Sequence, residues 1–230
     1  MRESLKVFLC TLILGGLVTL GCTKKEGTAG TTAQSAAPAP AAAPAATTAS
    51  PAPPAAGGSS VETTSKLAAV DWAIKQDAIK NDPDGQWAVS ATASSTYGDA
   101  KGTANWSANQ VTGLPNVDKY GDDGHAWAPK TPDGGIEWLD VKFPKPVHAT
   151  EIRVRESCGS GAVIKVELFD EQGVAHTAWA GNDPTTELNY LIVKLPKTEY
   201  KTDRVKVTLA TNVIPGWNEI DAIQLVGKDQ

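Results

Sequence analysis

Residues 136–157 read IEWLDVKFPKPVHATEIRVRES, and this stretch decides the fold class. Apolar and polar residues alternate over 136–143 and again over 149–157, on either side of the PKP at 144–146. A period of two is typical of β-strands that bury one face, and proline interrupts the pairing of a strand. The pattern therefore predicts two strands, 136–143 and 149–157.

Similar alternation, or enrichment in β-branched residues, recurs along the rest of the chain between turns rich in Gly, Pro, Asp and Asn. No long helical crossovers separate these windows, so antiparallel pairing is expected. The sequence predicts an all-β fold, an antiparallel eight-stranded jelly-roll sandwich with one N-terminal flanking helix. The six further windows are 87–97, 162–170, 174–181, 188–196, 204–211 and 218–226.

The flanking helix is predicted over residues 62–84, before a sandwich at 85–230. Apolar residues recur at spacings of three and four, and NDPDG at 81–85 ends the pattern. The helix either packs on the sandwich, with Trp72 as its anchor, or acts as a spacer, and we favour packing. The apolar stripe consists of Leu67, Val70, Ile74 and Ala78.

The N-terminal residues 1–21 are predicted to be an export signal. Arg2 and Lys6 precede an apolar run over 7–18, which is shorter than the roughly 20 residues that a membrane-spanning helix needs. The following TLGC resembles the lipobox of bacterial lipoprotein signal peptides, which implies that Cys22 is acylated and anchors the chain in a membrane of the cell envelope. Thr23 does not resemble the usual signal for retention in the inner membrane, which favours the outer membrane. The alternative is an ordinary secretory signal in which Cys22 is incidental.

A disordered tether is predicted over residues 22–61, behind the lipidated cysteine. Residues 27–61 contain no charged and no aromatic residue and consist mainly of Ala, Pro, Thr, Ser and Gly. Such a composition has little to bury, and its prolines favour extended segments.

The net charge is −5, from 21 Lys plus Arg against 26 Asp plus Glu. An acidic chain is not drawn to nucleic acid or to anionic lipid by its bulk charge, so we expect neither partner. Cation sites built from oxygen ligands remain compatible with this charge.

Several short motifs in the β-rich part resemble those of galactose-binding-like domains, the discoidin and coagulation-factor type C group of β-sandwiches. They are ASSTYGD, WSANQVTGLPN, GDDGHAWAP, EWLDVKFPKPVHATEIRVRE, GAVIKVELFDEQG and WNEIDAIQLVG, in this order along the chain. The resemblance implies the sandwich fold and, in many such domains, a structural calcium ion held by an early loop and a glutamate of the last strand.

Carried over to this chain, the resemblance implies a Ca²⁺ site between the loop at 113–127 and the C-terminal strand. Calcium prefers six to eight oxygen ligands, which carboxylate, amide and main-chain carbonyl groups supply. The alternative is that these residues form turns by bonding to nearby main-chain amides. The predicted metal ligands are Asn116, Asp118, Asp122, Asp123 and Glu219.

The leading functional hypothesis is a non-catalytic module that binds carbohydrate or another extracellular polymer. Sugar rings need a flat apolar face and a few fixed polar groups. The alternative function is a module that contacts a surface protein and has no small ligand. For each Trp, the alternative role is packing in the core. Trp127 and Trp138 are assigned to the core. The candidate ligand-binding residues are Trp106, His125, Arg155, Glu156, Trp179, Asn182 and Trp217.

Catalysis is not expected from the motifs present. The three histidines form no HExxH motif, and no GxSxG turn occurs. A pair of carboxylates that meet only in space stays open as an alternative, because sequence spacing does not reveal it.

Overall fold

A computed structural model describes residues 58–230 of the chain, with side chains from residue 64 onward. The predicted signal at 1–21, the predicted lipidation of Cys22 and most of the predicted tether at 22–61 lie outside the described residues. The elements are α1 (Gly58–Lys80), β1 (Gly85–Trp87), β2 (Ser90–Ala93), η1 (Tyr97–Asp99), η2 (Ala108–Val111), β3 (Ile136–Cys158), β4 (Val163–Asp170), β5 (Ala175–Ala180), β6 (Asn189–Lys194), β7 (Lys201–Ala210) and β8 (Glu219–Lys228).

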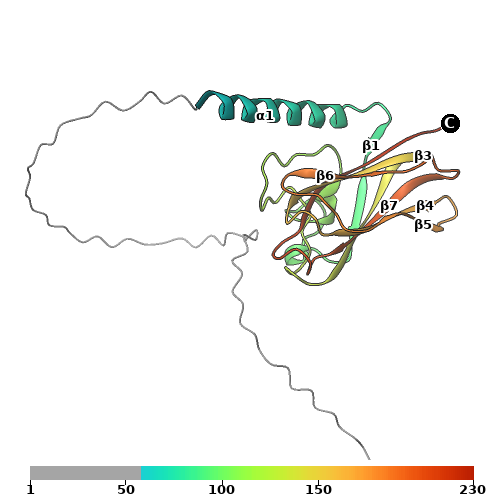
Figure 1. Cartoon of the computed structure of the whole chain (residues 1–230). Coiled ribbons are helices and arrows are strands. Elements are labelled where there is room, and N and C mark those ends of the chain that lie inside the picture. The colour runs from blue at the N-terminus through green and yellow to red at the C-terminus, as the bar shows by residue number, and fades with distance from the viewer. Residues whose placement is uncertain (1–57) are drawn as a thin grey trace, which may run out of the picture.

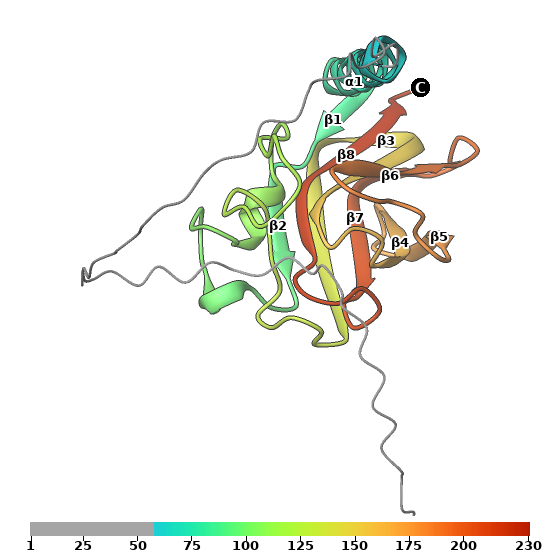
Figure 2. The same cartoon turned by 60° about the vertical axis from the view of Figure 1, so that its left-hand side comes forward.

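The strands form the two layers of an antiparallel sandwich, which confirms the predicted fold class. One layer has the order β1-β8-β3-β6, and the other has the order β2-β3-β7-β4-β5. Both orders contain β3, because its first half pairs with β2 and β7 and its second half with β6 and β8. Figures 1 and 2 show the two layers with α1 outside them.

The strand β3 changes layer at the PKP sequence. Its pairing with β7 shifts register between Lys142 and Val147, where the prolines cannot donate. The main chain of Lys145 bonds instead to the Gln86 side chain, which accepts from its N–H at 3.1 Å and donates to its carbonyl at 2.7 Å. The predicted strands 136–143 and 149–157 are therefore one bent element.

Both ends of β3 lie at the same end of the sandwich, which we call the rim. Ile136 pairs with Ala210 at the end of β7, and Cys158 pairs with Glu219 at the start of β8. Only residues 211–218 connect those two partners. The bend of β3 thus brings loops from both layers together at the rim, and Figure 2 shows the segment between β2 and β3 gathered beside them.

The predicted strand at 87–97 is divided in the structure. Its residues contribute to β1, which pairs with β8, and to β2, which pairs with β3. Between them the N–H groups of Ala88 and Val89 bond to Ile223 of one layer and Lys142 of the other, at 3.1 and 2.8 Å. The chain therefore crosses between layers here, so eight strands are present but with different boundaries from those predicted.

The helix α1 begins before the predicted residue 62 and ends before residue 84. Three residues of its apolar stripe, Leu67, Val70 and Ile74, are 61, 54 and 62% exposed, so these residues do not pack on the sandwich. Trp72, the predicted anchor, is 40% exposed and, with Ala78 of the stripe, lines a groove of about 1010 Å³ between α1 and the strands β3 and β6. Gln224 of β8 also donates to the carbonyl oxygen of Ile79 at 3.1 Å. Within the described part of the chain, no helix is long and apolar enough to cross a membrane.

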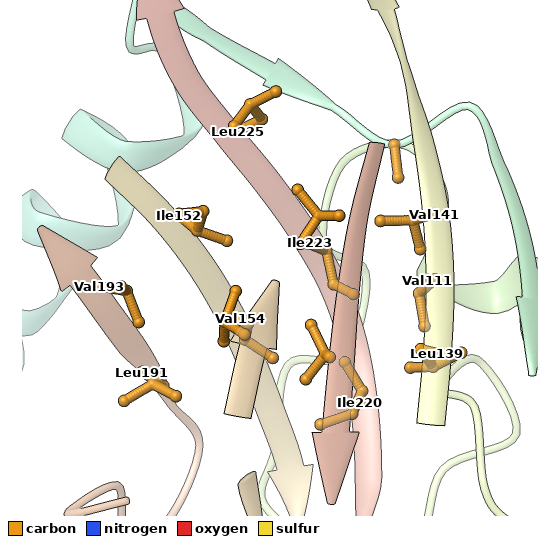
Figure 3. Packing of buried hydrophobic residues seen from close by; sticks show 14 of the residues in the cluster. Val111, Leu139, Val141, Ile152, Val154, Leu191, Val193, Ile220, Ile223 and Leu225 are labelled. Carbon is orange, nitrogen blue, oxygen red and sulfur yellow. The ribbon is translucent and has the colours of Figure 1, made fainter. Parts of the chain in front are cut away.

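The core lies between the layers and consists largely of β-branched and leucine side chains (Figure 3). Inward-facing residues alternate along the strands, as Ile152 and Val154 do in β3 and Ile223 and Leu225 in β8. The predicted core position of Trp127 is confirmed, because its side chain is fully buried. The prediction for Trp138 is wrong: this half-buried ring lies on the outer face of β3, with the Lys206 ammonium 4.6 Å from its centroid.

We expect Ile223→Ala to lower the free energy of unfolding by about 2–5 kcal/mol, because it leaves a cavity between the layers. The matched control is Ile136→Ala, which removes the same atoms from a residue that is 63% exposed. The control should change stability by less than about 0.5 kcal/mol. Urea denaturation of both variants checks this, and equal losses would contradict the described packing.

Candidate functional site

The long connection between β2 and β3 is fixed to the rim through Trp127. Its N–H donates to the Ile220 carbonyl at 2.8 Å, and Ile220 returns a hydrogen bond of 3.1 Å. The indole Nε1 donates to the carbonyl of Ser95 at 3.0 Å. One buried tryptophan therefore ties this connection to β8 and to the end of β2.

Three aromatic rings meet at the surface of this connection, and we call Tyr97, Trp106 and Trp217 the rim aromatic cluster. The ring of Tyr97 packs edge-on against Trp106 at 5.2 Å and against Trp217 at 5.1 Å between centroids. All three side chains are half-buried, so part of the cluster faces solvent. Two of the seven tryptophans, far apart in sequence, thus contribute to one surface through a shared tyrosine.

Trp106 is held in an uncommon main-chain conformation. Its φ is 59°, in the left-handed region, where a bulky residue is an outlier that needs support from its surroundings. Its N–H donates to the Gly124 carbonyl at 2.9 Å, and its carbonyl accepts from Ala128 at 3.3 Å. The indole Nε1 donates to Asp122 Oδ1 at 3.2 Å. These contacts fix the orientation of the ring before any ligand arrives.

The loop at 113–127 is held by a buried ion pair between Arg155 of β3 and Asp221 of β8. The carboxylate of Asp221 accepts the N–H groups of Asn116 and Val117 at 3.2 and 3.4 Å. The guanidinium Nε lies 3.3 Å from Asp221 Oδ2, and Nη2 donates to the Val117 carbonyl at 3.0 Å. Arg155 and Asp221 are 6 and 1% exposed, so the pair lies in the interior and the loop folds over it.

The environment of Asp221 opposes its ionisation. Burial raises the pKa of this carboxyl group to about 6, against its ordinary value of 3.8, and the charge of Asp123 acts in the same direction. The N–H groups of the loop and the guanidinium of Arg155 act in the opposite direction but do not cancel the effect of burial.

The predicted calcium ligands Asn116, Asp118, Asp122, Asp123 and Glu219 lie in and below the same loop. Glu219 is fully buried, and its Oε2 accepts the N–H of Asp123 at 3.1 Å. The Asp123 carboxylate accepts from the N–H of His125 at 2.9 Å, and Asp118 is exposed. Over residues 58–230 no group of three or more His, Cys, Asp and Glu side chains is arranged to hold a metal. The calcium ion stays a prediction.

The seven predicted ligand-binding residues do not form one site. Trp106 and Trp217 belong to the rim aromatic cluster, and the exposed His125 is held by Asp123, the neighbour of Asp122 in the chain. Arg155 and Glu156 are buried below the rim. The remaining two are Trp179, which packs against the core from β5, and the exposed Asn182 in the loop at 181–188.

Tyr97 and Asp221 are the residues of this region that the sequence analysis missed. Tyr97 is the last residue of the predicted strand 87–97, and its motif ASSTYGD does not indicate a binding role for it. Asp221 did carry one: Glu219 and Asp221 stand two residues apart in the β-pattern NEIDAIQLV, so both side chains leave the same face of a strand that is otherwise apolar.

Comparison with known families gives one match, over residues 76–230, to the family described as pappalysin-1, SD scarf domain, C-terminal. No protein of established annotation matches the chain.

Solved structures of similar fold include a chitosan-binding module from the chitosanase/glucanase of Paenibacillus sp. IK-5, with a TM-score of 0.45 and 14% identity over 60% of this chain and 94% of that one. The family 32 carbohydrate-binding module of C. perfringens NanJ, in complex with galactose, has a TM-score of 0.45 and 13% identity over 61% of this chain and 98% of that one. A Ruminococcus gnavus GH29 fucosidase has a TM-score of 0.45 and 15% identity over 66% of this chain, which spans 26% of the fucosidase. Each of these likenesses concerns the fold alone.

We expect the contribution of Asp221 to stability to decrease as pH rises. Since its pKa is raised from 3.8 to about 6, the folded state holds a proton that the unfolded state has lost between those values. Asp221 therefore contributes about 3 kcal/mol to the free energy of unfolding below pH ~4, and this contribution is lost by pH ~7.

The measurement compares urea denaturation of the wild type and Asp221→Asn from pH 4 to 7, in the presence of a chelator. Other titrating groups, Glu156 among them, are common to both proteins and cancel in the difference. The difference between the two stabilities should change across this window. Parallel curves would show that Asp221 has its ordinary pKa.

Proposed function

We propose that this chain, which belongs to the family described as pappalysin-1, SD scarf domain, C-terminal, is a lipid-anchored protein of the bacterial cell envelope whose β-sandwich binds carbohydrate at its rim. The binding is non-catalytic. The single observation that carries the proposal is the rim aromatic cluster, in which Trp106 is fixed beside a carboxylate and partly exposed.

The rim aromatic cluster has the chemical features that a sugar ring requires. The C–H groups of a pyranose pack on an aromatic face, while its hydroxyl groups need polar partners at fixed positions. Asp122 accepts from the indole of Trp106, so its carboxylate is fixed beside the rings, and His125 in the same loop is oriented by Asp123. A preorganised site of this kind loses little side-chain entropy on binding.

The charge of the rim narrows the class of saccharide. Asp122 contacts Trp106 of the cluster, Asp123 follows it in the chain, and the chain as a whole is acidic. Acidic polysaccharides would be repelled at close range, whereas neutral or basic saccharides would not. We therefore propose a neutral or basic glycan as the ligand.

Attachment to the membrane is proposed to occur through acylated Cys22, with the segment at 22–61 as the tether. Each buried methylene of an acyl chain contributes about 0.8 kcal/mol to membrane binding, so several chains on one residue hold the protein firmly. An extended tether of Ala and Pro residues would let the sandwich reach a polymer at a distance from the bilayer. The outer membrane is the proposed location.

A calcium ion is proposed to strengthen the same rim, with oxygens drawn from Asn116, Asp118, Asp122, Asp123 and Glu219. The contact between Asp123 and the buried Glu219 supports this proposal, because it brings the loop and the last strand together. Calcium there would add to the support of the loop that carries Asp122. The proposed role of this calcium ion is structural and not catalytic.

On a glycan array, the full chain in detergent should bind at least one neutral or basic class of glycan. Trp106→Ala should weaken that binding by about 30-fold or more, because a buried aromatic contact of this kind contributes roughly 2 kcal/mol or more. The control is Trp72→Ala, which removes another partly exposed indole from the distant helix α1. Equal binding by wild type and Trp106→Ala, or no binding to any glycan, would contradict the proposal, and the latter would favour a protein partner.

In bacteria fed labelled palmitate, the wild-type chain should carry the label and partition into the membrane fraction. Cys22→Ser should carry none and appear in the soluble exported fraction, because the acylated side chain is removed. Cys10→Ser is the control, since it removes a cysteine from the predicted signal at 1–21 and leaves Cys22 in place, so it should not alter labelling. Unchanged labelling of Cys22→Ser would contradict the anchor.

A further inference from the structure

A second group of oxygens lies below the rim, on the other side of β3 from the Arg155–Asp221 pair. Glu156 is 1% exposed at the end of β3. Its Oε2 accepts the N–H of Gly161 at 2.8 Å, whereas its Oε1 is buried and accepts no hydrogen bond in the described part of the chain. A buried carboxylate oxygen with no donor is costly and calls for an explanation.

The carboxylate of Asp183, from the loop between β5 and β6, contacts that of Glu156. Its Oδ1 accepts the N–H of Thr185 at 2.8 Å, while its Oδ2 is buried and likewise accepts no hydrogen bond from the residues described. Two acids in contact in the interior do not both stay ionised without a positive charge between them.

The protein does not supply that positive charge. Arg155 is the neighbour of Glu156 in the chain, but its side chain leaves the opposite face of β3 and is engaged by Asp221 and Val117. Neither Glu156 nor Asp183 forms an ion pair with Lys, Arg or His over residues 58–230. The pair therefore needs either a bound cation or a shared proton.

Further oxygens surround the two carboxylates. The Thr185 side chain is 7% exposed, and its hydroxyl group lies beside the Glu156 carboxylate. The main-chain carbonyls of Asp183 and Thr185 face Gly161, where a Cβ would lie 3.5 and 3.2 Å from their oxygens. Gly161 has a φ of 101° and no side chain, so it leaves this space to the oxygens.

We propose that Glu156, Asp183 and Thr185 bind a hard divalent cation, Ca²⁺, at this position. All of the donors are oxygens, and they include two carboxylates, a hydroxyl and nearby carbonyls, which is the donor set that calcium prefers over zinc. Only two of the side chains are acidic, which explains why no group of three or more acids, histidines or cysteines is found in the described part of the chain. The low ligand charge favours weak binding, in the range of about 10⁻⁴–10⁻³ M that extracellular modules use.

The bound cation would join three segments that no strand pairing connects. It would fix the loop at 181–188 and the turn at 159–161 to the end of β3, and Thr185 lies on the wall of the groove under α1, which gives the ion a path from solvent. The site is separate from the rim aromatic cluster. Its existence does not depend on the proposed carbohydrate function.

The test is calorimetric titration of the full chain in detergent with CaCl₂, after metal has been removed by a chelator. The melting temperature is also measured without Ca²⁺ and with Ca²⁺ in large excess. We expect Glu156→Gln and Asp183→Asn each to weaken calcium binding at this site by at least about tenfold, because ligand charge determines affinity. Thr185→Val should weaken binding less. The control is Asp99→Asn, an exposed acid that pairs with Lys130.

Two further arms keep the result decisive. The Gln and Asn variants should fold without metal, with melting temperatures at or above that of the metal-free wild type, because the new amide donates to the carboxylate that remains. Glu219→Gln tests whether this site is distinct from the proposed rim calcium site. It should leave calcium binding by Glu156 and Asp183 intact, whereas Asp183→Asn should weaken that binding. Calcium binding that disappears only in Glu219→Gln, or a wild type that binds no calcium, would overturn the proposal, and in the second case a shared proton would account for the pair.

Discussion

The buried ion pair between Arg155 and Asp221 is the interaction on which the rim depends. It lies between β3 and β8, and through it the main chain of Asn116 and Val117 is fixed to the sandwich. Removing two charges from water costs free energy that their attraction repays only when further hydrogen bonds satisfy both groups. Here the loop supplies part of them, to the Asp221 carboxylate and from the Arg155 Nη2 group, while Arg155 Nε finds no hydrogen-bond acceptor among the described residues. The cost of burial is therefore only partly offset, in agreement with the raised pKa of Asp221.

The number and type of strands could be predicted from the sequence, but not all of their boundaries. Alternation in the stretch around residues 136–157 correctly indicates two extended runs, and the prolines at 144 and 146 correctly mark an interruption. A sequence window cannot distinguish a turn between two strands from a bend within one, because the difference lies in which partners pair on either side. For the same reason the crossing at Ala88 and Val89, where hydrogen bonds change layer, was read as one continuous strand.

The candidate site was predictable only in part, because its residues meet through the fold. Trp106 and Trp217 are among the predicted ligand-binding residues, yet the ring that joins them, Tyr97, begins the short helix η1, whose sequence does not indicate such a role. Arg155 and Glu156 were identified as polar residues in a strand, but neighbouring positions of a strand face opposite sides, so they serve two different clusters. The apolar stripe of α1 shows the converse error, since helical periodicity reveals a face without revealing whether anything covers it.

The bend in β3 has a consequence for how the sandwich opens. Because one strand supplies hydrogen bonds to both layers, neither layer retains a complete ladder if the other separates. Local opening should therefore be confined to the peripheral strands, such as β5 and β6, while amide protons of β3, β7 and β8 exchange only when the whole domain unfolds. A single continuous backbone thus makes two sheets behave as one cooperative unit, and mechanical load that enters the sandwich through β1 would be shared by both.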